Sequence, residues 1–136
     1  MMIIVDSDGL IGSLNPDDFH YEVSNKLLST FIKKQAKLVY PATVIAEAIT
    51  FLQGRLNKPH LAERVMQLVN EDKLNIEPVD TLILKQASLF MNLKKSKRHT
   101  LFDAVVAAIA QKYQADAIFS FDTFYKKKGF KLASNL

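Results

Sequence analysis

The 136-residue sequence contains no cysteine and no tryptophan. Without cysteine the chain can form no disulfide, no thiolate metal site and no cysteine nucleophile. The lack of tryptophan, in a chain too short for a long substrate cleft, also argues against glycoside hydrolysis by paired acids. Glycine and proline are scarce, at four residues each, and 49% of the residues are hydrophobic. This composition predicts one ordered globular domain over residues 1–136.

Long apolar runs are also missing. The longest one, Ala104–Ala110, is far shorter than the roughly 18 residues that a membrane-spanning helix needs. The five residues before Asp6 have neither the basic start nor the apolar length of a secretory signal. We therefore expect a cytoplasmic protein with no membrane segment.

Positive charge is concentrated in one part of the chain. The net charge is +4, yet the segment from Lys94 to Lys131 holds nine of the 18 basic residues and only three acidic ones, which gives this segment +6 and the rest −2. A basic segment favours a polyanionic partner such as nucleic acid, although a solvated lysine face is the more common explanation of such a run.

Short apolar segments of strand character alternate with helical patterns. Strands are expected at 2–5, 38–40, 74–79, 117–121 and 131–133, and helices at 19–34, 43–56, 59–69, 81–94 and 101–113. This alternation predicts right-handed crossovers and a parallel sheet covered by helices on both faces.

Four acidic residues share one position relative to the expected sheet. Asp6 and Asp122 follow strands, while Glu47 and Asp103 lie near the starts of helices that follow the strand ends. The carboxyl ends of parallel strands meet at one edge, where open α/β folds bind ligands. Residues more than a hundred positions apart are therefore expected to converge there.

Each of these acids also has a purely structural interpretation. Asp6 and Asp122 could be helix N-caps, Thr100 and Asp103 form the T-x-x-D pattern of a capping box, and Glu47 could interact only with a helix dipole. However, Asp103 and Glu47 are surrounded by apolar residues, which a cap does not require. Carboxylates crowded in such a place repel one another unless a cation is present, and an all-oxygen set favours Mg²⁺ or Mn²⁺ over Zn²⁺.

The ordered set of motifs resembles the PIN-domain ribonucleases, and most closely their small VapC-type toxins. The motifs are the strand ending at Asp6, Pro41-x-Thr43 leading to Glu47, Leu101-Phe-Asp103-Ala-x-x-Ala107, and Ile118-Phe-Ser120-Phe-Asp122. The resemblance implies a three-layer α/β/α fold with a central five-stranded parallel sheet. It also implies an acidic pocket for one or two divalent ions.

Within this resemblance, Asp6, Glu47, Asp103 and Asp122 would be the catalytic, metal-binding carboxylates. The residues expected to orient carboxylate or water around them are Asp8, Thr43 and Ser120. A metal pair would activate water and stabilise the leaving oxygen of a phosphodiester. The basic residues on either side would hold the RNA backbone: Lys94, Lys95, Lys97, Arg98, Lys126, Lys127 and Lys128.

The resemblance further implies partners, namely an RNA substrate, an antitoxin protein whose tail would cover the acidic pocket, and a second copy of the chain. The surface for such a homodimer would be helical and would comprise Phe51, Leu52, Leu56, Leu61 and Val65. A single PIN domain acting in RNA processing would have the same sequence features.

Two other functions remain open from the sequence. The stretch Val5-Asp-Ser-Asp-Gly-Leu10 also resembles the first motif of haloacid-dehalogenase-type phosphatases, in which Asp6 would be the nucleophile and Asp8 the general acid and base. Alternatively, the chain could be a non-catalytic basic RNA-binding module whose carboxylates are only helix caps.

Overall fold

A four-stranded parallel sheet forms the centre of the protein. The computed structural model describes residues 1–94 and 98–136. Within these residues the strands are β1 (Met2–Val5), β2 (Lys37–Pro41), β3 (Ile76–Glu77) and β4 (Ala117–Phe119), in the order β3-β2-β1-β4. In β1, Ile3 lies opposite Leu38 on one side and Ala117 on the other. The first strand is therefore an inner strand, and its residues Ile3, Ile4 and Val5 are buried.

The expectation of a fifth strand at 131–133 is wrong. Leu132 forms only an isolated parallel bridge with Ile118, whose N–H donates to the carbonyl of Lys131 at 2.9 Å. The chain then turns at once into a short 3₁₀ helix, Ala133–Asn135, so no ladder can extend along this edge.

Helices occupy the segments between the strands. Their bounds are α1 (Ser7–Leu14), α2 (Tyr21–Lys33), α3 (Ala42–Gln53), α4 (Pro59–Asn70), α5 (Thr81–Ala87), α6 (Leu101–Tyr113) and α7 (Phe124–Lys127). The expected helix over 81–94 is shorter than predicted, because α5 ends at Ala87 and continues only as a 3₁₀ turn, Ser88–Phe90.

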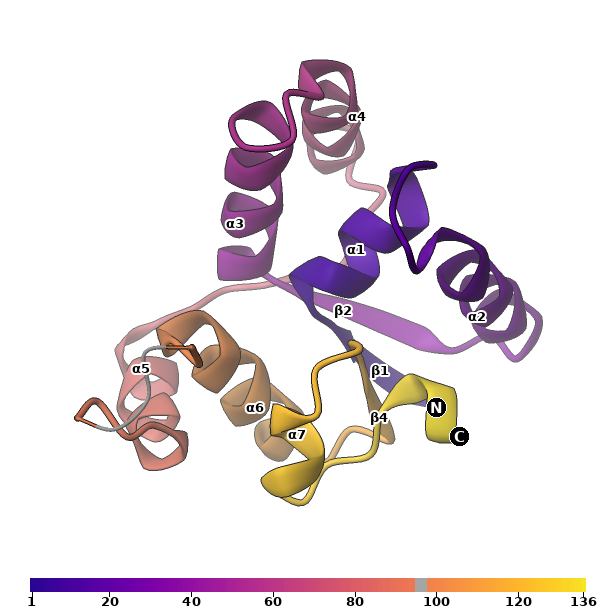
Figure 1. The fold of residues 1–136 in the computed structure, drawn as a ribbon. Coiled ribbons are helices and arrows are strands. Elements are labelled where there is room, and N and C mark those ends of the chain that lie inside the picture. The colour runs from indigo at the N-terminus through magenta and orange to yellow at the C-terminus, as the bar shows by residue number, and fades with distance from the viewer. Residues whose placement is uncertain (95–97) are drawn as a thin grey trace.

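The helices cover both faces of the sheet (Figure 1). The α1–α2 pair lies on one face and α5, α6 and α7 lie on the other, which gives the expected three layers. Residues Ala104–Ala110 of α6 are all buried. On the opposite face α1 approaches β4 so closely that a Cβ on Gly9 would lie 2.4 Å from the carbonyl oxygen of Phe119.

Helices α3 and α4 form a hairpin that projects away from the sheet (Figure 1). Leu52 of α3 and Val65 of α4 are completely buried. These two residues therefore belong to the core and cannot form part of the dimer surface that the sequence suggested. Phe51, on the neighbouring face of α3, is 36% exposed.

None of the helices described is both long and apolar enough to cross a membrane.

Candidate functional site: carboxylates at the ends of the strands

Asp6 lies at the carboxyl end of the central strand. Its backbone N–H donates to the carbonyl of Phe119, so the residue continues the pairing of β1 with β4. Its Oδ1 accepts the N–H of Ser7 at 2.8 Å and caps α1, while its Oδ2 accepts the hydroxyl of Tyr125 at 2.7 Å. The side chain is buried, and this burial raises the pKa of Asp6 well above its ordinary value, with the charge of Asp8 raising it further.

Asp8 fixes the segment that follows β4. Its Oδ1 accepts the N–H of Gly9 at 2.8 Å, and its Oδ2 accepts the N–H of Phe121 at 2.8 Å and the hydroxyl of Ser120 at 3.1 Å. Burial raises the pKa of Asp8, and these donors oppose the effect. The Ser120 oxygen in turn accepts the N–H of Asp122 at 3.1 Å. Asp8 and Ser120 therefore hold the backbone that carries Asp122.

Glu47 reaches the same edge from α3 and is half-buried. Burial raises the pKa of Glu47, a hydrogen bond from the side chain of Ser7 lowers it, and the charges of Asp103 and Asp8 raise it. The pKa of Glu47 is thus affected by carboxylates on two other helices, α6 and α1.

Asp103 is a helix cap whose side chain also lies near the other carboxylates. Its Oδ2 accepts the backbone N–H of Thr100 at 3.0 Å, so the predicted capping box is present at the start of α6. Burial is nevertheless the main effect on this side chain and raises the pKa of Asp103, with the charge of Asp122 adding to it.

Asp122 is partly exposed, with 37% of its side chain accessible. Its Oδ1 accepts the N–H of Phe124 at 2.9 Å and lies 3.4 Å from Nε2 of His99. Its charge raises the pKa of both Asp8 and Asp103. The predicted convergence of residues from β1, α3, α6 and the end of β4 is therefore seen in their mutual electrostatic effects.

The chemistry of these side chains fits a hard divalent cation, because every donor is an oxygen and their ionised forms repel one another. The hydroxyl oxygen of Thr43, near the start of α3, is buried without a hydrogen-bond partner. Across residues 1–94 and 98–136, however, no group of three or more Asp, Glu or His side chains is arranged to hold a metal ion.

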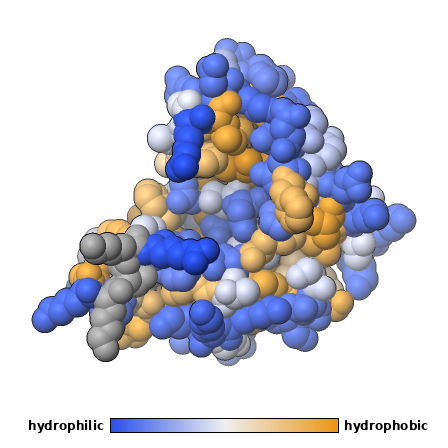
Figure 2. Space-filling model, viewed as in Figure 1, coloured by the Kyte–Doolittle hydropathy of each residue, from blue (hydrophilic) through white to orange (hydrophobic). Residues whose placement is uncertain are grey.

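Three of the predicted basic residues line hollows beside the carboxylates. Arg98 is exposed and lines a hollow with Asp8 and Asp122, and Lys127 and Lys128 line a second hollow on the other side of Asp122. Lys94 and Lys126 are exposed, whereas Lys95 and Lys97 fall outside the described residues. In the space-filling view, hydrophilic residues gather in the middle of this face between hydrophobic ones (Figure 2).

Sequence reasoning missed Tyr125 and His99 as members of the site. The Tyr125 hydroxyl contacts Asp6 across 119 positions of the sequence, and His99 approaches Asp122 across 23. The only sequence signal for Tyr125 was an aromatic residue three positions after Asp122, which gives no indication of what its hydroxyl contacts.

Comparisons with known proteins agree with this architecture. A family model described as PIN domain matches residues 3–131. The fold is similar to that of VapC20 from Mycobacterium tuberculosis, described as a sarcin-ricin loop cleaving toxin, with a TM-score of 0.81, 19% identity, and 94% of this chain and 95% of that chain covered. It is also similar to a chain of FitAcB from Neisseria gonorrhoeae, with a TM-score of 0.69, 18% identity, and 99% and 100% coverage. No curated protein sequence matches.

Proposed function

Because this chain belongs to the PIN domain family, we propose that it is a divalent-metal-dependent endoribonuclease. The observation that carries the proposal is the group of carboxylates Asp6, Glu47 and Asp103, whose pKa values are raised by burial and by neighbouring acidic side chains, with Asp122 beside Asp103. Such a group is costly to ionise without a cation, and Mg²⁺ or Mn²⁺ suits its oxygen donors.

Each part of the site has a distinct role in this proposal. Asp6, Glu47, Asp103 and Asp122 would hold the ion or ions, which when bound lower the pKa of water and neutralise charge on the phosphate. Tyr125 holds one oxygen of Asp6 in a fixed direction.

The surrounding residues support this group. Asp8 fixes the loop of Asp122, and the buried Thr43 hydroxyl supplies a further oxygen at the same edge. The described basic residues Lys94, Arg98, Lys126, Lys127 and Lys128 would bind the RNA backbone.

We further propose that the protein is the toxin of a toxin–antitoxin pair, with an antitoxin partner covering the acidic edge. The similarity to VapC20, described as a toxin, extends over nearly the whole of both chains and supports this role. Formation of a homodimer remains part of the proposal, with the exposed part of α3 around Phe51 available for it.

The phosphatase alternative is less consistent with the site. A general acid and base must exchange a proton with the substrate, whereas Asp8 accepts three hydrogen bonds from Gly9, Ser120 and Phe121. The match to the PIN domain model, over nearly the whole chain, favours the nuclease.

The test combines metal binding with RNA cleavage in three variants. Asp6→Asn and Asp103→Asn remove the charge and leave the shape of each side chain, and Asp80→Asn is the control because Asp80 caps α5 through the N–H of Ile83. A metal site stabilises the wild type by about 2.7 kcal/mol at Mn²⁺ concentrations 100 times the dissociation constant, which raises Tm by several degrees. We expect Asp80→Asn to keep this rise and RNA cleavage, and both site variants to lose them. If Mn²⁺ stabilises none of the proteins and the wild type leaves RNA intact, a binding module without catalysis is the better description.

A further inference from the structure

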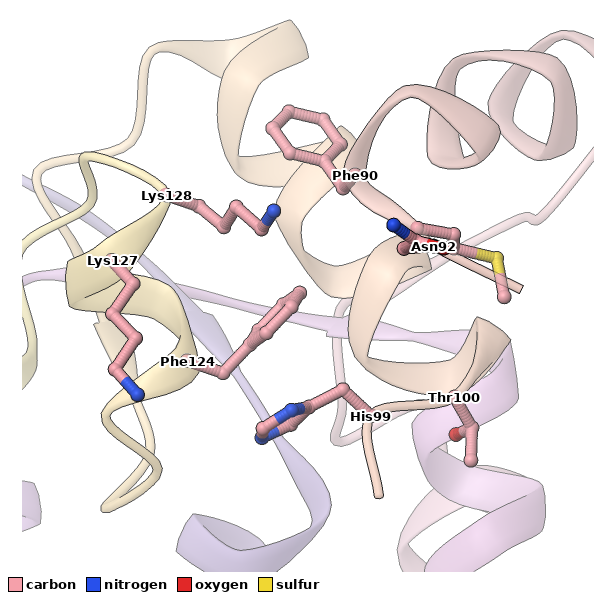
Figure 3. Close-up of a pocket in the computed structure, with 8 residues that line it drawn as sticks. Phe90, Asn92, His99, Thr100, Phe124, Lys127 and Lys128 are labelled. Atoms are coloured by element: carbon pink, nitrogen blue, oxygen red, sulfur yellow. The ribbon is translucent and has the colours of Figure 1, made fainter. Parts of the chain in front are cut away.

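A pocket with a volume of about 220 Å³ lies beside the carboxylates. It is enclosed by the end of the 3₁₀ turn, the segment before α6, and α7 (Figure 3). Its walls are formed by Phe90, Met91, Asn92, His99, Thr100, Phe124, Lys127 and Lys128. None of these residues was predicted to form a pocket, although the two lysines were expected to bind RNA.

The walls combine aromatic rings with positive charge. The ring of His99 is stacked on Phe124 with 4.7 Å between centroids, and Nζ of Lys128 lies 5.7 Å from the centroid of Phe124. Figure 3 shows the Lys128 amino group between the rings of Phe90 and Phe124. An occupant that suits such walls must be flat and aromatic in one part and anionic in another, and a nucleotide has both properties.

The pocket shares a wall with the proposed catalytic centre. His99 lines the pocket with its ring, while its Nε2 lies 3.4 Å from Oδ1 of Asp122. Thr100, which also lines it, donates its backbone N–H to Asp103. A phosphodiester held at the carboxylates would therefore have its neighbouring nucleotide next to this pocket.

We propose that the pocket takes the nucleobase adjacent to the scissile phosphate of a single-stranded RNA, with the base against Phe90 and the nearby phosphate on Lys128 and Lys127. The proposal rests on the nuclease function proposed above and adds a subsite to it. Stacking on an aromatic ring tolerates all four bases, so this subsite would favour an unpaired nucleotide more than a particular sequence. It would thus select RNA loops and single strands over duplexes.

Two variants test the aromatic and cationic walls separately. Phe90→Leu keeps most of the apolar volume and removes the ring face, and Leu89→Ala is its control because Leu89, in the same 3₁₀ turn, is 79% exposed and does not line the pocket. Lys128→Gln removes one charge. Its control is Lys34→Gln, because Lys34 is exposed and directly follows α2, just before β2 begins, at the opposite edge of the sheet.

The first measurement is the steady-state cleavage of a single-stranded RNA with Mn²⁺, below the Tm of every variant. We expect Phe90→Leu to raise KM about tenfold, within the range that stacking of one base provides. Lys128→Gln should raise KM and reduce the slope of log KM against log salt by about 0.7, the value for one phosphate contact on a single strand. Both controls should match the wild type, and the Mn²⁺-induced rise in Tm should be the same in all five proteins.

The second measurement separates this proposal from the nuclease function. Nucleoside 5′-monophosphates and ribose 5-phosphate are titrated into the protein, and binding is followed by NMR. We expect the nucleotides to bind more tightly than the sugar phosphate, and Phe90→Leu to remove this difference. That result supports the pocket even if the wild type fails to cleave RNA, which would overturn only the nuclease proposal. If the wild type cleaves RNA and Phe90→Leu behaves like Leu89→Ala in both measurements, the pocket does not bind a nucleobase.

Discussion

The buried contact between Tyr125 and Asp6 gives the sharpest quantitative prediction. Replacing Tyr125 by Phe removes a hydroxyl that donates to Oδ2 of Asp6 at 2.7 Å and changes little else in shape. That hydrogen bond lowers the pKa of Asp6, against the large increase that burial causes. Its removal must therefore raise the pKa of Asp6 further.

The size of the change follows from the strength of such bonds. A hydrogen bond to a charged group contributes about 1.5–3 kcal/mol, and one pKa unit corresponds to about 1.4 kcal/mol. The variant should therefore raise the pKa of Asp6, and where the proton competes with the ion it should weaken Mn²⁺ binding by about ten- to a hundredfold. Below that pKa a cation must displace the proton, so its dissociation constant increases about tenfold for each unit by which the pH falls.

The assay is calorimetric titration of Mn²⁺ at several pH values between about 6 and 8.5. We expect the curve of Mn²⁺ affinity against pH for Tyr125→Phe to be displaced to higher pH than that of the wild type. The matched control is Tyr40→Phe, because Tyr40 is a buried tyrosine of β2 whose pKa is raised to about 12 by burial alone. A Tyr125→Phe profile that overlays both the wild type and this control would refute the reasoning.

Three further predictions concern stability. The buried carboxylates have pKa values above those of an unfolded chain, so the metal-free protein should become less stable as the pH rises from about 4 through these values. Urea unfolding at pH 5 and pH 7.5 measures this loss of stability. The loss should be smaller when Mn²⁺ is present, or when one of the carboxylates is changed to its amide. Gly9→Ala should lower the free energy of unfolding by about 1–3 kcal/mol, because the new methyl group would clash with the carbonyl oxygen of Phe119. The loss should be visible as a fall in Tm. An unchanged Tm would contradict the close packing of α1 on β4. Lys58→Ala should cost about 1 kcal/mol because it removes one of the two donors to Oδ1 of the buried Asn15, the other being the backbone N–H of Asp17. Asp17→Asn should change stability much less because the Asp17 side chain is exposed, and equal losses in denaturant unfolding would count against this assignment.

Short sequence patterns correctly predicted the helices and strands whose ends are determined by residues close by in the sequence. The helix over 101–113 was predicted with its observed bounds because Thr100 and Asp103 form the capping box and the following residues are almost all apolar. The first strand was predicted for a similar reason, since a β-branched run ends at a polar residue. The prediction of a fifth strand was wrong because such a strand depends on pairing with β4. The sequence does not show that this pairing is limited to a single bridge at Leu132.

The carboxylates could be predicted from topology, but their partners could not. Parallel strands bring Asp6 and Asp122 to one edge whatever the side chains do, so an ordered pattern of acids was sufficient. The sequence contains no comparable rule for hydrogen bonds between distant side chains. The contact of Asp6 with Tyr125 and the three donors to Asp8 depend on the rotamers and packing of the completed fold.

The capping box at the start of α6 limits how this site can vary. One oxygen of Asp103 is committed to the backbone of Thr100, so a longer or shorter acid at this position would disturb the first helical turn together with any ligand geometry. Glu47 lies within α3 and has no cap to maintain, so its length can change without affecting a helix end. Redesign of the proposed metal site should therefore begin at Glu47, where a change of side-chain length does not alter a helix end.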